Sequence, residues 1–271
     1  MYSRMSRGWQ IAINALKVLG ANKQLIIFPI LSGLTILMVI SSFFFGITFT
    51  KGFAGIDEQN TVTIYGLIFL FYMVSYFIVV FFNMALIHCT TLYFKGEEAS
   101  ISKGINFSFS RIWLIFSWAV FAATIGTLLK ILQDNLGQIG KFVISILGFA
   151  WSAATFFAVP VIAYEKLMPL DATKRSFTIL KEKWGQSVVA NFSFGLLTLL
   201  AFLVLGIAAI AVSELINMEL GIALFAVGVG IIAIITSAIK TIIISAAYHN
   251  IDNNMDIHFN RQLLDGLFVE K

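Results

Sequence analysis

The stretch from residue 62 to residue 94 reads VTIYGLIFLFYMVSYFIVVFFNMALIHCTTLYF and contains no Asp, Glu, Lys or Arg. About twenty apolar residues suffice for a helix to cross a hydrocarbon core of roughly 30 Å, because each residue adds about 1.5 Å. Backbone N–H and C=O groups in lipid must find hydrogen-bond partners within the same segment. The stretch therefore predicts a membrane-spanning helix.

Five further stretches are nearly free of charge and long enough for the same role. They cover residues 25–50, 112–132, 142–164, 187–212 and 220–248. A membrane β-barrel would need shorter segments in which apolar and polar residues alternate, and no such alternation occurs. We therefore expect an all-α fold, a polytopic transmembrane helical bundle with six spans. The basic stretch before the first span, and the length of that span, argue against a cleavable signal peptide.

The composition agrees with a membrane location. Of the 271 residues, 59% are hydrophobic and 12% are charged, whereas soluble domains carry roughly a quarter charged residues. An ordinary soluble enzyme is therefore excluded. The single cysteine, Cys89, cannot build a disulfide framework, and the high apolar fraction excludes a disordered chain.

The 18 Lys and Arg residues are distributed unevenly among the connections. Lys and Arg are retained on the cytoplasmic side of a membrane. With the N-terminus inside, only Lys51, Lys130 and Lys141 fall on the outer side, and Lys240 lies within the sixth span. The distribution predicts a multi-pass protein of a prokaryotic cytoplasmic (inner) membrane, with both termini in the cytoplasm.

Several segments on the predicted cytoplasmic side have the periodicity of amphipathic helices, which lie at the membrane interface. Such helices are expected at residues 1–24, 99–111, 169–185 and 256–267, together with one membrane domain over residues 25–268. In the segment 169–185, the apolar stripe contains Leu170, Phe177, Leu180 and Trp184, and the basic residues lie off that stripe.

A tyrosine closes each even-numbered span, at Tyr93, Tyr164 and Tyr248. Ten residues after these tyrosines stand Lys103, Lys174 and His258. The pattern predicts a three-fold parallel repeat, in which each unit is a helical hairpin followed by an interfacial helix. Tyrosine belts and cytoplasmic lysines also occur at inner boundaries without any repetition, so both interpretations stay open.

The segment after the fourth span carries a more specific pattern. It contains Tyr164 and Glu165, the run LDATKRSF at 170–177, ILK at 179–181 and WG at 184–185. Over this segment the chain resembles a broad group of uncharacterised prokaryotic polytopic membrane proteins, which includes the membrane domain attached to some glycerophosphodiester phosphodiesterases. The resemblance implies a membrane module. It transfers no active site, because the long polar segments that a phosphodiesterase domain needs are absent from this sequence.

No cluster of residues predicts catalysis or metal binding. His88, His249 and His258 lack the i, i+4 spacing of a metal-binding helix, and the adjacent His88 and Cys89 point about 100° apart on a helix. Ser, His and Asp occur without a nucleophile-elbow glycine pattern. We therefore expect no enzymatic activity, no catalytic or metal site, and no cofactor.

Basic residues near the interfacial helices are the candidates for a lipid- or anion-binding site. They are Lys103, Lys174, Arg175, Lys181 and Lys240. Each basic residue near an anionic leaflet contributes on the order of 1 kcal/mol, so the set would attract phosphatidylglycerol or cardiolipin. The positive-inside rule alone would produce the same belt, and the long stem of Lys240 could simply snorkel toward the headgroups.

Two functions of different class follow from these features. The first is a non-enzymatic membrane module that binds anionic lipids or supports a membrane partner. The second is a small transporter or channel for a hydrophobic or amphiphilic substrate, favoured by the repeat, by Lys240 within the sixth span and by Pro160, which should kink the fourth span. Expected partners are anionic membrane lipids, with a membrane-protein partner or a second copy of the chain as open alternatives, and no nucleic acid.

Overall fold

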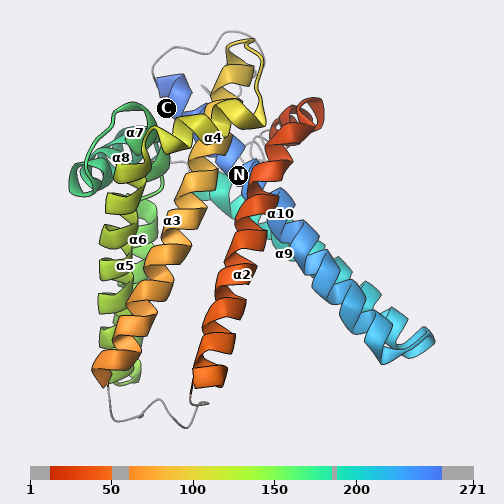
Figure 1. The fold of residues 1–271 in the computed structure, drawn as a ribbon. Helices are drawn as coiled ribbons and strands as arrows, with labels where there is room; N and C mark the ends of the chain where they lie inside the picture. Colours follow the sequence, from red (N-terminus) through yellow and green to blue (C-terminus); the bar gives the residue numbers. More distant parts are fainter. Residues whose placement is uncertain (1–12, 51–60, 185–187, 252–271) are drawn as a thin grey trace. The chain divides into compact units, whose positions relative to one another are not determined.

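The computed structural model describes residues 13–50, 61–184 and 188–251 (Figure 1). In chain order its elements are η1 (Lys23–Ile26), α2 (Ile27–Thr50), α3 (Thr61–Phe94), α4 (Ile101–Phe109), α5 (Ile112–Asn135), α6 (Gln138–Ala154), α7 (Ala158–Tyr164), α8 (Pro169–Trp184), α9 (Val188–Leu215) and α10 (Met218–Ile251). Residues 13–21 form a further helix before η1. No strand occurs among these described residues, and the prediction of an all-α fold is confirmed.

Six helical segments of the described chain are long and apolar enough to cross a membrane, as predicted. They are Lys23–Gly46, Val62–Phe94, Ile112–Asn135, Gln138–Tyr164, Thr198–Leu215 and Met218–His249. The third and fourth segments extend toward each other beyond their predicted ends, because the helices continue through the polar residues at which the sequence placed the boundaries. An ion pair between Lys130 and Asp134, one turn apart, stabilises this extension of α5.

The chain divides into two compact units. Unit 1 comprises Met1–Pro29, Cys89–Ser100 and Glu182–Lys271, and unit 2 comprises Ile30–His88 and Ile101–Lys181. The helix α3 contributes to both units. The single domain expected over residues 25–268 and the interfacial position of the short helices stay predictions, and the helix expected at 256–267 lies outside the described residues.

In unit 2, α3, α5 and α6 lie side by side, with α4, α7 and α8 gathered at one end (Figure 1). Gly126 of α5 permits close approach to α3, since a Cβ there would lie 3.2 Å from the ring of Tyr72. Trp118 of α5 is buried and stacks on Trp151 of α6, with ring centroids 6.3 Å apart. Small residues and aromatic pairs of this kind hold helices together in lipid, where water supplies no driving force between them.

The fourth span is interrupted near one end. The helix α6 ends at Ala154, residues 155–157 form turns, and α7 begins at Ala158. Pro160 lies in the first turn of α7, where its missing N–H is tolerated, while its ring would clash with the carbonyl four residues earlier in a continuous helix. The kink predicted at Pro160 is therefore an interruption that precedes the proline. At this interruption the Phe157 N–H donates a hydrogen bond to Ser176 Oγ of α8 at 2.9 Å.

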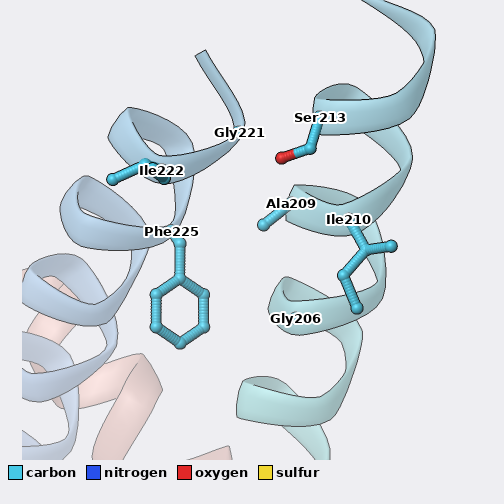
Figure 2. A pocket seen from close by; sticks show the side chains of 7 residues that line it. All are labelled: Gly206, Ala209, Ile210, Ser213, Gly221, Ile222 and Phe225. Carbon is cyan, nitrogen blue, oxygen red and sulfur yellow. The ribbon is translucent and has the colours of Figure 1, made fainter. Parts of the chain in front are cut away.

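In unit 1, α9 and α10 form a closely packed hairpin. A Cβ at Gly221 would meet Ser213 Oγ and lie 2.7 Å from the carbonyl oxygen of Ala209, and one at Gly228 would meet Leu205. Figure 2 shows Ser213 and Ala209 of α9 pointing toward Gly221 of α10. An open, mainly apolar groove at this contact is lined by Gly206, Ala209, Ile210, Ser213, Gly221, Ile222 and Phe225. The glycines thus serve helix packing.

A buried polar contact joins the end of α3 to α10 within unit 1. Thr91 Oγ1 lies 2.7 Å from His249 Nε2 and 3.5 Å from Ser245 Oγ. All three side chains are buried. Because buried polar groups are costly without partners, this contact fixes the pairing of the two helices.

The three-fold repeat stays a prediction. The helices α4 and α8 each follow a residue with left-handed backbone, which is Gly96 (φ 73°) before α4 and Lys166 (φ 54°) before α8. The first two hairpins are thus followed by similar local structures. The corresponding segment after α10 lies outside the described residues.

Candidate functional site

The end of unit 2 that carries α4, α7 and α8, here named the α4–α8 end, gathers most of the charged side chains singled out from the sequence. The helix α4 follows α3 through a short connection, and α8 follows α7 after the left-handed turn at Lys166. Contacts of Phe107 in α4 with Tyr164 in α7, and of Ser176 in α8 with Phe157, hold these elements at one end. Lys103, Lys174, Arg175 and Lys181 belong to this region.

Arg111, between α4 and α5, is the most constrained cation of the α4–α8 end. Its Nε donates a hydrogen bond to the carbonyl oxygen of Ala163 at 2.6 Å, and its Nη1 donates to Ser110 Oγ at 2.6 Å. The guanidinium carbon lies 3.6 Å from the centroid of the Phe107 ring. A backbone carbonyl, a hydroxyl and an aromatic face therefore fix the orientation of this planar cation.

His88 completes a stack with Phe107 and Arg111. Its ring lies 3.8 Å from the Phe107 ring centroid at an interplanar angle of 8°. Two planar groups this close cannot share one face of a ring, so His88 and the Arg111 guanidinium lie on opposite faces of Phe107. The Tyr164 ring packs against the same phenylalanine at 5.7 Å. The stack thus joins α3, α4, α5 and α7.

The charge of Arg111 is not balanced within the described chain. Ion pairs among the described residues join Lys130 with Asp134, Lys174 with Asp171 and Arg175 with Glu165, and none includes Arg111. Burial lowers the pKa of the Arg111 guanidinium from its ordinary value, and the nearby Tyr164 hydroxyl opposes this shift. An arginine remains protonated at neutral pH, so the α4–α8 end holds a partly desolvated positive charge.

Arg175 and Lys174 do have carboxylate partners. Arg175 Nε lies 3.1 Å from Oε1 and 3.0 Å from Oε2 of Glu165, and both side chains are partly covered. Lys174 Nζ lies 3.4 Å from Asp171 Oδ1, and both of these side chains are mostly exposed. The first pair fixes the turn between α7 and α8, whereas an exposed pair such as the second contributes little.

The helix α8 presents two different faces. Ala172, Ser176 and Ile179 are buried against the rest of unit 2. Leu170 and Phe177 are 57% and 52% exposed, and the side chains of Lys174 and Lys181 are exposed as well. The spacing i, i+4, i+7 and i+11 places these four on one face of the helix.

This arrangement differs from the sequence-based interpretation, which put the lysines off the stripe of Leu170 and Phe177. Two of the three buried residues named above, Ala172 and Ser176, are too small to mark the buried face of α8 in the sequence, and the third is Ile179. The exposed face that includes Leu170, Lys174, Phe177 and Lys181 is named the α8 stripe below.

The other residues considered from the sequence are Lys103, Lys240 and Cys89. Lys103 is exposed on α4, and Lys240 is exposed on α10 and belongs to unit 1. Cys89 is buried, and its Sγ lies 3.2 Å from the carbonyl oxygen of Ser100. Across the described ranges, no group of three or more His, Cys, Asp and Glu side chains is arranged to hold a metal ion.

Sequence reasoning missed the part of Phe107, Arg111 and Tyr164 in this region. Two signals were available in the sequence. Arg111 directly precedes the third span, and Phe107 lies four residues before Arg111. That spacing places a cation above a ring where the chain is helical. The bond to Ala163 had no sequence signal, since it depends on how α7 packs against α5.

These features define a multi-pass helical membrane protein with a cationic, aromatic-rich end. The chain belongs to the family described as "Family of unknown function (DUF6159)", which it matches over residues 62–256. No curated protein matches the chain. The matched region includes Arg111, its stack and the whole of α8.

Proposed function

We propose that this protein is a non-enzymatic membrane module that binds anionic phospholipids at the α4–α8 end of unit 2. The distribution of Lys and Arg favours a cytoplasmic position for this end in a prokaryotic inner membrane, where anionic headgroups would attract its basic residues. The lipid surface is the principal partner. A membrane-protein partner or a second copy of the chain is part of the same proposal, because a lipid-bound module can position either.

The α8 stripe is the observation that carries the proposal. Leu170 and Phe177 are more than half exposed, while Ala172, Ser176 and Ile179 are buried on the opposite face. An exposed apolar face with lysines beside it is typical of a helix in the plane of the membrane interface. In that position the apolar side chains enter the acyl boundary, and the lysine stems extend toward phosphate groups.

The charge balance of α8 favours the lysines over Arg175 as lipid contacts. The Glu165 carboxylate already accepts hydrogen bonds from Arg175 and balances its charge. Arg175 therefore has less attraction left for a lipid phosphate. Lys174 and Lys181 reach the surface on the α8 stripe. At about 1 kcal/mol for each lysine near an anionic surface, the two together account for about a thirtyfold preference for anionic over neutral lipid.

The resemblance of the segment 164–185 to the membrane domain attached to some glycerophosphodiester phosphodiesterases supports the module class. A module of this kind acts by holding lipids or partners at the membrane, not by chemistry of its own. The absence of enzymatic activity is part of the proposal.

The test is lipid selection in nanodiscs that contain phosphatidylglycerol and phosphatidylethanolamine, read by native mass spectrometry of the ejected protein. The double variant Lys174→Gln/Lys181→Gln is expected to lower the phosphatidylglycerol preference by about thirtyfold. The matched control is Lys130→Gln/Lys141→Gln, which removes the same charge. It should lose at most about fivefold, since Asp134 already balances Lys130. Equal losses in the two double variants would contradict the proposal.

A second candidate function is a small transporter for a hydrophobic or amphiphilic substrate. The specific observation in its favour is the interruption of the fourth span at residues 155–157, because broken helices line substrate paths in many transporters. The discriminating experiment measures transbilayer movement of fluorescent phosphatidylglycerol in proteoliposomes. Movement no faster than in protein-free liposomes would exclude transport of this lipid and retain the binding module.

A further inference from the structure

We propose that Arg111 anchors one specific phospholipid by its phosphate group. This inference rests on the proposed function and deepens it, since it assigns a single headgroup site distinct from the general attraction of the α8 stripe. It depends on the geometry of Arg111 and its neighbours in α4, α5 and α7.

The Arg111 guanidinium has N–H groups that find no acceptor among the described residues. Its Nε is used by the Ala163 carbonyl oxygen and one Nη1 hydrogen by Ser110 Oγ. Both hydrogens on Nη2 and the second hydrogen on Nη1 remain without an acceptor among the described residues. These adjacent donors form the fork that binds two oxygens of one phosphate.

The guanidinium is also preorganised. The Phe107 ring lies 3.6 Å below it and His88 supports that ring from the other face at 3.8 Å. An arginine held in this way loses little further side-chain entropy when an anion binds. A bound phosphate would supply the negative charge that no carboxylate of the described residues supplies to Arg111.

The helix that follows adds to the positive potential. Arg111 is the N-cap residue of α5, and the first turn of α5 contains no acidic residue. A helix N-terminus carries a partial positive charge, which a cation at the N-cap does not balance. This field strengthens the attraction of the Arg111 fork for an anion without being a site of its own.

The surroundings favour a phosphate that carries acyl chains. Phe109, at the end of α4, is 55% exposed, and Trp113, in the first turn of α5, is 78% exposed. Tryptophan is enriched at headgroup level, and Phe109 adds exposed apolar surface beside it. Phe116 continues the exposed apolar surface one turn further along α5, with its ring centroid 6.4 Å from that of Trp113. A lipid phosphate on Arg111 would thus place its acyl chain along Trp113 and Phe116.

The test counts lipids retained after gentle activation in native mass spectrometry, starting from phosphatidylglycerol nanodiscs. The wild-type protein is expected to keep one phospholipid after the others are stripped. Arg111→Gln should lower this retention at least about tenfold, and Arg111→Lys should give an intermediate value, because an ammonium cannot form the fork. Unchanged retention in Arg111→Gln would overturn the inference.

Measurements on the wild-type protein keep the inference testable if Arg111→Gln does not fold. Phosphatidylglycerol should be retained at least about tenfold better than diacylglycerol with the same acyl chains, since diacylglycerol lacks the phosphate. Equal retention of the two would overturn phosphate recognition. Displacement of the retained lipid by excess inorganic phosphate would instead show that the site takes free phosphate, and would overturn the lipid assignment.

The α8 double variant separates this inference from the proposed function. Lys174→Gln/Lys181→Gln should keep the single retained lipid while losing the broader anionic preference. If that variant loses its preference and Arg111→Gln retains its lipid, the Arg111 site fails and the proposed function stands. If the double variant keeps its preference and Arg111→Gln loses its lipid, the Arg111 site stands and the assignment to the α8 stripe fails.

Discussion

The basic side chains at the two ends of unit 2 have different interaction partners. At the α5–α6 turn, Lys130 pairs with Asp134 at 2.7 Å, and Tyr65 of α3 donates to the same carboxylate at 3.4 Å. At the α4–α8 end, the partners of Arg111 in the described chain are an aromatic ring, a carbonyl oxygen and a hydroxyl, and the lysines of the α8 stripe lie beside exposed apolar side chains. The α5–α6 turn thus balances Lys130, whereas the α4–α8 end balances Arg175 and Lys174 but leaves Arg111 without a carboxylate partner among the described residues.

Basic residues can lie at one end of a membrane protein because of the positive-inside rule alone, or because they form a binding surface. The positive-inside rule requires only that basic residues lie on one side, and it sets no requirement on how they are held. A guanidinium fixed between a ring and a backbone carbonyl is more ordered than that rule demands. The α4–α8 end therefore has the features of a binding surface, whereas the α5–α6 turn has those of a stabilised helix end.

The largest expected effect comes from removal of Arg111. Arg111→Gln loses a charged hydrogen bond and the contact with the Phe107 ring, so the free energy of unfolding should fall by about 3 kcal/mol. Unfolding by denaturant in neutral-lipid bicelles measures this change without the contribution of a bound anion. Lys130→Gln, at the α5–α6 turn, is the control, and its free energy of unfolding should fall by at most about 0.5 kcal/mol, as for a surface ion pair. A similar loss in both variants would remove the contrast between the two ends.

A smaller loss is expected at Ser176. Ser176→Ala leaves the buried N–H of Phe157 without its acceptor, which costs about 1–3 kcal/mol of unfolding free energy. Ser145→Ala is the matched control, because Ser145 Oγ donates only to the Lys141 carbonyl oxygen within α6 and is exposed. Its change should stay within about 0.5 kcal/mol. If Ser176→Ala changes the free energy of unfolding as little as Ser145→Ala does, the bond from Phe157 to α8 does not stabilise the interrupted span.

The release of Arg175 should sharpen the contrast. Glu165→Gln removes the carboxylate that balances Arg175, so the phosphatidylglycerol preference in mixed nanodiscs should rise about fivefold, as for one added cation. Glu165→Asp keeps the charge and should leave the preference unchanged. A preference that falls in Glu165→Gln would mean that the ion pair is needed to form the α8 surface.

The smallest effect is expected at Asp171. Its partner Lys174 is already exposed, and exposed ion pairs contribute little. Asp171→Asn should raise the phosphatidylglycerol preference less than about twofold and change the unfolding free energy by less than about 0.5 kcal/mol. A rise as large as that of Glu165→Gln would show that the ion pair with Asp171 weakens the attraction of Lys174 for anionic lipid.

The spans and short helices could be predicted because they depend on local length and periodicity. Residues 62–94 are apolar enough to fix α3 by themselves, and α8 was predicted at 169–185 against the observed Pro169–Trp184. The contacts of Arg111 and Arg175 could not be predicted. Arg175 reaches Glu165 across the left-handed turn at Lys166, and Arg111 reaches the carbonyl oxygen of Ala163 at the end of α7. The first contact depends on a local turn of the backbone, and the second on packing between residues 52 positions apart in the sequence.

Photocrosslinking with a phosphatidylglycerol that carries a diazirine near its headgroup tests the central claim most directly. The labelled peptides of the membrane-embedded protein would be identified by mass spectrometry, with unlabelled phosphatidylglycerol and phosphatidylethanolamine as competitors. The account predicts labels concentrated at residues 101–116 and 169–181, reduced by phosphatidylglycerol and not by phosphatidylethanolamine. Labels no denser there than at residues 130–141, or equal competition by both lipids, would contradict it.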